Sequence, residues 1–281
     1  MKQATLIITL LISFATLHAQ VNSDINQGRA NYSLISNISN DATSFYKTSL
    51  DFVQSPFHFD SRDFMMTGII AGVTALSFTL DNSVRNVMKR NHNTSMDNIM
   101  NVSEKLGSPQ YGLALSGVLY LGGQFTQENE LRKTGVILAE AVFLNGITTE
   151  VLKIVMGRSR PYNNEGNYDL DFIRINDEDN SLPSGHTSTA FTIATVLSQR
   201  IDNTFASIAL YSFAGLTAVQ RIYADRHWFS DVVLGAAIGT VVGLKVVKIN
   251  SEYDNQNSSV KMNVYPVLSN GSYGAGLMLS F

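Results

Sequence analysis

Six apolar segments of helical length constrain this 281-residue chain more than any other feature of its sequence. They are rich in Ala, Gly, Leu and Val and are separated by polar stretches, which favours helices over strands. The sequence therefore predicts an all-α fold, a six-helix bundle that occupies residues 61–250. The apolar segments cover residues 64–80, 111–125, 134–156, 187–197, 205–219 and 228–247.

The apolar helices leave two topologies open. With an exported N-terminus, three membrane crossings would place the end of the third helix in the cytoplasm, although the substrates of an exported enzyme usually lie outside. Either one of the first helices does not cross, or the bundle is a periplasmic body with buried hydrophobic helices. The mean hydropathy of +0.04 is low for six spans, and the third helix contains Glu140, Asn145 and Glu150. These features favour the periplasmic body.

The N-terminal region has the pattern of an exported protein. Lys2 precedes an apolar run of about a dozen residues, and Leu17-His18-Ala19 has the form of a cleavage site, so residues 1–19 are predicted to be a signal peptide. The alternative is an uncleaved anchor helix. Residues 20–60 are polar and predict a poorly packed lead-in, in which residues 22–26 and 37–41 have the composition of loops or short helices. Both alternatives predict a place in the bacterial cell envelope, periplasmic or membrane-associated, with the functional site facing the periplasm.

The last residues change character. Apolar and polar residues alternate on both sides of Asn270-Gly271, a strong hairpin turn signal. Residues 258–281 are therefore predicted to form a short β-hairpin. A complete membrane barrel needs about eight strands, for which the chain has no room, so we expect the hairpin to pack on the bundle.

Composition excludes several functions. The net charge is −3 and no long basic run occurs, so nucleic acid is not an expected partner. The chain has no cysteine, which excludes disulfides, thiolate metal sites and cysteine nucleophiles.

The first chemically suggestive segment follows the third apolar helix. Lys153 ends that helix, and Arg160-Pro161 lies in the turn after it because Gly157 and Pro161 both disfavour helix. Two cations would then meet where an apolar helix opens to water. By itself the pattern also fits cations that snorkel at a helix end.

The second segment, Pro183-Ser184-Gly185-His186, opens the fourth helix. Ser184 is a suitable N-cap, and the free amides of a first helical turn bind anions. Gly185 would let an anion approach the backbone closely, and His186 could move a proton beside it. An ordinary Ser-capped helix with an exposed histidine is an equally good interpretation of this segment alone.

The third segment runs from Arg221 to Asp231. His227 and Asp231 are four residues apart and share a helix face, so the carboxylate could hold one ring nitrogen protonated and leave the other as a nucleophile. Arg221 adds a forked cation suited to phosphate. The alternative is a polar pair on an exposed helix face. Antiparallel packing would bring all three segments to one end of the bundle, and such a set of charges suits phosphoryl transfer.

Together these segments resemble the signature of the type 2 phosphatidic acid phosphatase and vanadium haloperoxidase superfamily: Lys-x6-Arg-Pro, Pro-Ser-Gly-His and Ser-Arg-x5-His-x3-Asp. The resemblance is close over residues 153–231, and the helix pattern extends it to about 64–248. One position departs, because Gln220 stands where the family usually has a phosphate-binding serine.

The resemblance implies a metal-independent phosphoric ester hydrolase without a cofactor. His227 would form a phosphohistidine, Asp231 would orient it, and His186 would protonate the leaving group and then activate water. The implied substrate is a phosphate monoester or diphosphate, of a lipid such as phosphatidate, a polyprenyl diphosphate or lipid A, with the membrane as the expected partner. The implied phosphate-binding residues are Lys153, Arg160, Ser184, Gly185 and Arg221.

Three alternatives accompany this hypothesis: a vanadate-dependent haloperoxidase, a non-specific soluble periplasmic acid phosphatase, and a non-enzymatic envelope protein that kept the bundle. The acidic loop over residues 162–180 would border the site and select substrates, or would simply be solvated. His58 and His92 have no comparable setting and are interpreted as surface or packing residues.

Overall fold

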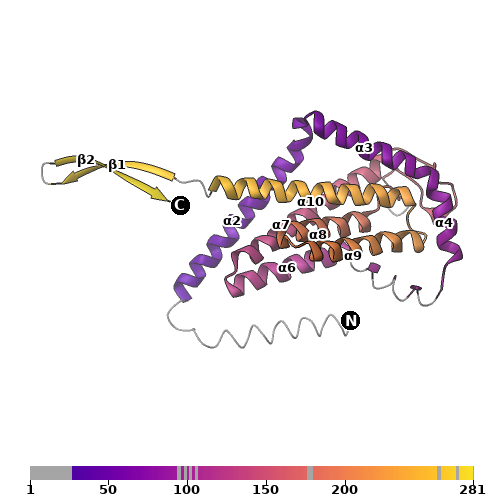
Figure 1. Ribbon diagram of the computed structural model, residues 1–281, viewed down its shortest axis with the longest axis horizontal. Coiled ribbons are helices and arrows are strands. Elements are labelled where there is room, and N and C mark those ends of the chain that lie inside the picture. The colour runs from indigo at the N-terminus through magenta and orange to yellow at the C-terminus, as the bar shows by residue number, and fades with distance from the viewer. Residues whose placement is uncertain are drawn as a thin grey trace.

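The structure is a computed structural model, and most of the bundle is a set of long helices lying side by side (Figure 1). It describes residues 27–93, 96–97, 100, 103–104, 107–175, 180–257, 261–269 and 272–280. The predicted signal peptide and the Asn270-Gly271 turn lie outside these residues. The described helices are α2 (Gln27–Gln54), α3 (Ser61–Ser77), α4 (Asp81–Arg90), α6 (Pro109–Thr126), α7 (Asn129–Met156), α8 (Gly185–Ile201), α9 (Thr204–Tyr223) and α10 (Phe229–Asn257), with short 3-10 turns at Ser55–His58, Phe78–Leu80 and Pro161–Asn163.

Each of the six expected apolar segments lies in a helix, but α2 and α4 are additional, so the expected count of six was too low for the described residues. The expectation of a loop or short helix at residues 37–41 was wrong, because these residues lie within α2, which spans 28 residues. The predicted segment at residues 22–26 lies outside the described residues. Tertiary contacts explain the difference. The Phe45 and Phe143 ring centroids lie 5.8 Å apart, and Phe52 packs against the core. One face of α2 is therefore covered despite its polar composition.

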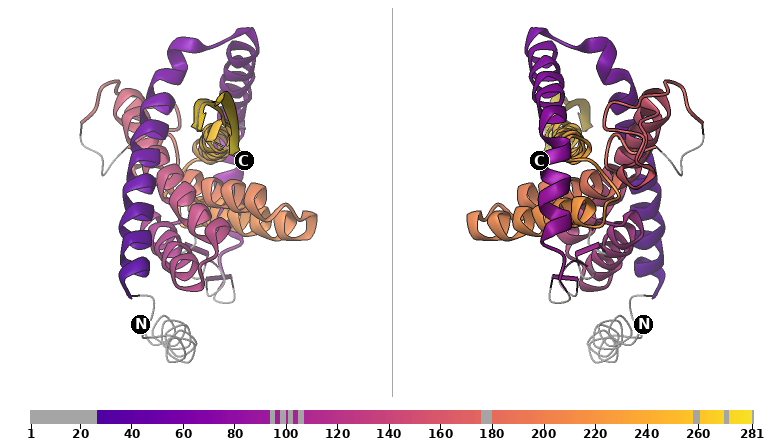
Figure 2. Two further views of the ribbon diagram at one scale, coloured as in Figure 1. Left: turned by 90° about the vertical axis from the view of Figure 1, so that its left-hand side faces the viewer. Right: turned by 90° about the vertical axis from the view of Figure 1, so that its right-hand side faces the viewer.

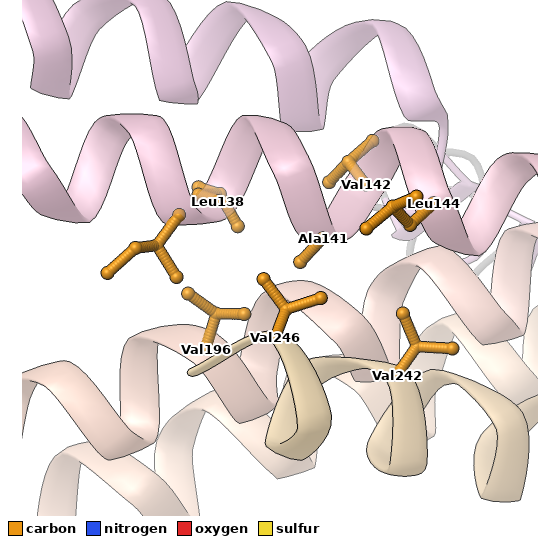
Figure 3. Close-up of a cluster of buried hydrophobic side chains, with 8 residues drawn as sticks. Leu138, Ala141, Val142, Leu144, Val196, Val242 and Val246 are labelled. Atoms are coloured by element: carbon orange, nitrogen blue, oxygen red, sulfur yellow. The ribbon is translucent and has the colours of Figure 1, made fainter. Parts of the chain in front are cut away.

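The main hydrophobic core lies between α7, α8 and α10 (Figure 3). On α7 and α10 its buried members recur at spacings of three or four residues, as on one face of a helix. Helix α8 contributes Val196 together with the partly buried Ile193 and Leu197. The buried members of the cluster are Ile137, Leu138, Ala141, Val142, Leu144, Val196, Val242 and Val246.

A stripe of glycines brings α10 directly onto α8. A methyl group at Gly235 would lie 2.7 Å from the carbonyl oxygen of Ser184, and one at Gly243 would lie 2.9 Å from Cβ of Thr195. At Gly239 the same group would overlap the Ser188 carbonyl. These glycines are four residues apart, and such spacing of small residues lets helix backbones touch. The stripe fixes the start of α10 against the start of α8.

The outer surface of the bundle is apolar. Four helical stretches are long and apolar enough to cross a membrane, by length and composition. Large apolar side chains are exposed along them, with Leu76 72% and Phe205 82% exposed. The expectation of a periplasmic body with buried hydrophobic helices was therefore wrong, because a bundle in water would not present so much apolar surface. The four stretches are Ser61–Arg90, Asn129–Met156, Thr204–Tyr223 and Phe229–Asn255.

The C-terminal residues form two strands where the sequence predicts a hairpin. Strands β1 (Lys261–Ser269) and β2 (Ser272–Ser280) pair antiparallel, with Lys261 opposite Ser280 and Ser269 opposite Ser272. In Figure 1 the strands lie beyond the C-terminal end of α10, and in Figure 2, which looks along the long axis, they overlap that helix. The packing of the hairpin on the bundle stays a prediction, because residues 258–260, which join α10 to β1, lie outside the described residues.

Candidate active site

The three predicted segments meet at the end of the bundle beside α4, where α7 and α9 end and α8 and α10 begin (Figure 1). Hydrogen bonds of the backbone hold the third segment together and join it to the second, and the first segment lies close to the second. The amide of Ser184 donates to the carbonyl of Asp231 at 3.0 Å, and the amide of His227 donates to the carbonyl of Arg221 at 3.2 Å. A methyl group at Gly185 would lie 3.9 Å from Nζ of Lys153. Helix ends therefore position all three segments as antiparallel packing predicts.

His227 is held by a contact that the sequence does not predict. Its Nδ1 lies 2.8 Å from the carbonyl oxygen of Ser181 and 3.6 Å from Oδ2 of Asp231. A carbonyl can only accept, so Nδ1 must carry the proton and Nε2 keeps its lone pair. Asp231 was expected to fix this tautomer, yet the Ser181 carbonyl is the nearer partner.

The charge state of His227 suits a nucleophile. Burial lowers the pKa of its ring to about 4, outweighing the opposing effect of Asp231, and the charges of Arg160 and Arg221 lower it further. The imidazole is therefore neutral at pH 7. A neutral ring with a lone pair on Nε2, beside two guanidinium groups, can attack an electron-poor centre that carries anionic oxygens.

The carboxylate of Asp231 has two other partners of its own. Its Oδ2 accepts from the amide of Trp228 at 2.8 Å, and its Oδ1 accepts from Nη1 of Arg158 at 2.5 Å. Arg158 was not among the predicted site residues. The sequence contains one signal for it, a second arginine two residues before Arg160, but a pattern of spacings cannot separate a buried ligand of a carboxylate from a surface cation.

The predicted cations line the same end of the bundle. Nζ of Lys153 lies 3.1 Å from Oε1 of Glu150. Arg160 donates from Nη1 to the carbonyl of Arg226 at 3.5 Å, while its buried Nε has no hydrogen-bond partner among the described residues. A buried donor without a partner costs free energy, so Nε of Arg160 offers a bond to an anionic ligand.

Arg221 is held between two side chains. Its Nε donates to Oε1 of Gln220, and its Nη2 lies 2.7 Å from Oε1 of Glu104. Gln220, the departure from the family pattern, therefore orients the arginine. Glu104 was not predicted, because it lies over a hundred residues before Arg221 in the sequence. The hydrogen bond from Arg221 is the main cause that lowers the pKa of Glu104.

His186 lies half-buried at the start of α8. Burial lowers its pKa to about 4, and the charges of Arg221, His227 and Lys153 act in the same direction, opposed by Glu104. The ring is therefore neutral at pH 7 while no anion is bound. These neighbours place His186 in the same electrostatic environment as the other predicted residues.

One detail of the second segment differs from expectation. Ser184 occupies the N-cap position of α8, but its side chain makes no capping hydrogen bond; its Oγ lies 3.0 Å from Oγ1 of Thr187. The expectation that Gly185 lets an anion approach the backbone stays a prediction. A methyl group there would make ordinary contacts of 3.6 Å or more, so no protein atom requires glycine at this position.

Residues outside the motifs have structural settings. His58 is exposed and its Nδ1 lies 3.1 Å from the carbonyl of Gln54. His92 stacks on Tyr223 with a 3.8 Å centroid separation. In the acidic loop, Asp169 accepts from the hydroxyl of Ser159 at 2.6 Å, while residues 176–179 lie outside the described residues. One acid of this loop thus braces the segment between Lys153 and Arg160.

Comparison with known proteins gives consistent matches. Residues 134–253 match the model of the PAP2 superfamily. The chain is 31% identical over 176 residues to lipid A 1-phosphatase of Porphyromonas gingivalis, covering 62% of this chain and 36% of that protein. It is 26% identical over 173 residues to a PA-phosphatase related-family protein of Dictyostelium discoideum, covering 55% of this chain and 64% of that protein. The matched region thus spans about a third of the length of the first relative and just under two thirds of the second.

A solved structure shares the fold. The transmembrane PAP2 type phosphatidylglycerolphosphate phosphatase from Bacillus subtilis aligns with a TM-score of 0.51 at 17% identity, covering 67% of this chain and 96% of that one. At this identity the likeness concerns the fold alone.

Proposed function

Because the chain belongs to the PAP2 superfamily through residues 134–253, we propose that it is a phosphatase that transfers a phosphoryl group from a lipid to His227 and then to water. The observation that carries the proposal is the setting of His227. Its Nδ1 proton is committed to the Ser181 carbonyl, so Nε2 is left with a lone pair beside Arg160 and Arg221.

In the first step, Nε2 of His227 bonds to phosphorus while the bond from phosphorus to the leaving oxygen breaks. Lys153, Arg160 and Arg221 hold the phosphoryl oxygens, together with the Ser184 hydroxyl and the amides at the start of α8. His186 gives its proton to the leaving oxygen. The neutral His186 of the empty site gains that proton once a phosphate dianion arrives, because a nearby anion raises the pKa of a histidine.

In the second step, His186 takes a proton from water as the water oxygen bonds to phosphorus. The bond between phosphorus and Nε2 then breaks, which releases inorganic phosphate and restores His227. The phosphohistidine ring is cationic, since Nδ1 keeps its proton and still donates it to the Ser181 carbonyl, and Asp231 at 3.6 Å offsets that charge. Every proton transfer is thus assigned to a residue of the chain.

The substrate class follows from the surface around the site. The apolar exposed faces of α3 and α9 suit a protein that meets its substrate in a lipid layer. A phosphorylated lipid fits this setting better than a soluble ester. The relative from Porphyromonas gingivalis is named a lipid A 1-phosphatase, which makes a lipid A phosphate the first substrate to test, followed by phosphatidate and a polyprenyl diphosphate.

The test uses the full chain purified in detergent. His227→Ala should lower kcat by about 10³-fold or more on p-nitrophenyl phosphate and on the lipid panel, as removal of a nucleophile does. The wild type should form an acid-labile, alkali-stable phosphoprotein that the variant does not form. His58→Ala is the matched control, because His58 is exposed and distant from the motifs. Hydrolysis that survives in His227→Ala would refute the proposal.

A further inference from the structure

Arg158 is more completely enclosed than any other cation in the described part of the chain. Its side chain is 0% exposed, and its guanidinium lies 4.0 Å from the ring centroid of Phe78 and 5.5 Å from that of Trp228. Nε donates to the carbonyl of Asn167 at 3.0 Å. A cation in such a place is destabilising unless anions accompany it, so its partners determine its role.

Those partners are two buried carboxylates. Nη1 donates to Oδ1 of Asp231 at 2.5 Å and to the hydroxyl of Ser230 at 2.7 Å. Nη2 donates to Oδ2 of Asp81 at 2.6 Å. Asp81 is itself 0% exposed. Arg158 therefore bridges the carboxylate beside His227 to a second carboxylate that no motif includes.

Asp81 is fixed from a different part of the chain. It is the first residue of α4, outside the residues that match the family model. The amide of Ser230 donates to its Oδ1 at 2.8 Å, and the hydroxyl of Ser230 donates to its Oδ2 at 2.8 Å. The residue next to Asp231 is thus tied to Asp81 by two bonds, besides the bridge through Arg158.

The formal charges of this buried cluster have a consequence for His227. Two carboxylates and one guanidinium sum to −1. If Asp81 were neutral, Arg158 would cancel the charge of Asp231, and the cationic ring of a phosphohistidine would lose its counter-charge. Electrostatic effects of this kind are large where water is excluded.

We propose that Asp81 and Arg158 are positioning residues for phosphoryl transfer, which hold Asp231 in place and preserve a net negative charge beside His227. The inference rests on the proposed function. It assigns to α4 a part in the chemistry, although none of its side chains is placed against the phosphate. A purely structural cluster would affect folding but not the turnover of folded protein.

The main test is Asp81→Asn, which keeps the shape of the side chain and removes its charge. We expect kcat to fall about 10- to 100-fold, a size typical of groups that orient a catalytic residue, with KM changed by less than about 2-fold because the phosphate-binding cations are untouched. Asp41→Asn is the matched control. Asp41 also pairs with a buried arginine, Arg132, but on α2 and away from the motifs, so it should leave kcat per folded molecule unchanged.

Ser230→Ala provides a second, milder variant in case Asp81→Asn does not fold. It removes one bond to Asp81 and one from Arg158, both of them charge-assisted. Because Arg158 still contacts Asp81 directly, kcat should fall only about 3- to 10-fold at constant KM. An unchanged kcat in the folded variants, or a rise in KM alone, would overturn the inference. Activity that survives His227→Ala would instead refute the proposed function, so the two failures are distinct.

Discussion

Buried ion pairs lie near both ends of α7, and they differ in how their partners are exposed. Near its start, Arg132 pairs with Asp41, and both side chains are largely buried, at 9% and 16% exposed. Near its end, the side chains of Lys153 and Arg221 are only 10% and 6% exposed. Their partners Glu150 and Glu104 are each 49% exposed.

This contrast separates a structural pair from an exchangeable one. Tyr120 also donates to Asp41 at 3.1 Å, so the first cluster ties α2 to α6 and α7. At the other end, a dissolved anion can replace a half-exposed carboxylate on a buried cation without exposing the cation. The cations at the two ends are buried to a similar degree, and the exposure of their carboxylate partners is what differs.

The largest expected effect tests the two arginines against each other. Arg221→Ala should lower kcat/KM about 10²- to 10³-fold with little loss of stability, because it removes a donor to the transferring phosphoryl group. Arg132→Ala should destabilise the fold by about 3–5 kcal/mol, because it leaves Asp41 buried without its partner, and should leave kcat per folded molecule unchanged. Steady-state kinetics and thermal unfolding in detergent measure both. Equal kinetic losses in the two variants would abolish the distinction.

A smaller effect concerns the dependence of stability on pH. The pKa values of His186 and His227 are lowered to about 4 in the folded chain, below the usual value of about 6.5 in the unfolded chain. Between these values the unfolded state binds more protons, so the contribution of both histidines to stability is present above about pH 6.5 and is lost as the pH falls towards 4.

We therefore expect the melting temperature of the wild type to fall more steeply between pH 6.5 and 4 than that of His186→Gln. The matched comparison is His58→Gln, at an exposed position, which should follow the wild type. Parallel curves for all three proteins would show that the histidines of this end are not held neutral by burial.

The smallest effect tests whether phosphate replaces the carboxylate of Glu104 on Arg221. Glu104→Gln removes the charge that competes with phosphate for Arg221, so KM for a phosphate monoester and Ki for inorganic phosphate should both fall about 2- to 5-fold, in line with the modest strength of a half-exposed ion pair. Glu252→Gln, in the exposed pair with Lys248, is the control. A rise in KM would mean that Glu104 orients Arg221 and does not compete with the substrate.

How much of this site the sequence can predict depends on where each partner lies. Lys153, His186 and His227 were expected to converge, and they do, because spacing places them at helix ends that antiparallel packing brings together. The acceptor for His227 is a backbone carbonyl, that of Ser181, and carbonyls carry no sequence signature. Asp81 could not be found from the motifs, since its role depends on how α4 packs.

The fold likewise has parts that the sequence predicts and parts that only tertiary contacts reveal. The apolar helices were predictable because each carries its own hydrophobic run. Helix α2 was not, since its average is polar and only the contacts of Phe45 and Phe52 reveal its buried face. The membrane-facing surface was misjudged because mean hydropathy combines long polar segments with apolar ones, whereas exposure is a property of each side chain.

The glycine contacts between α8 and α10 have a consequence for how the protein would respond to the thickness of a host bilayer. With the backbones touching at Gly235 and Gly239, the helices that begin beside His186 and His227 are set by main chain against main chain and not by deformable side chains. A bilayer whose thickness does not match the length of the apolar helices would tilt the two helices together as one body. Turnover should therefore change little with the acyl-chain length of the host lipid, even where the melting temperature changes.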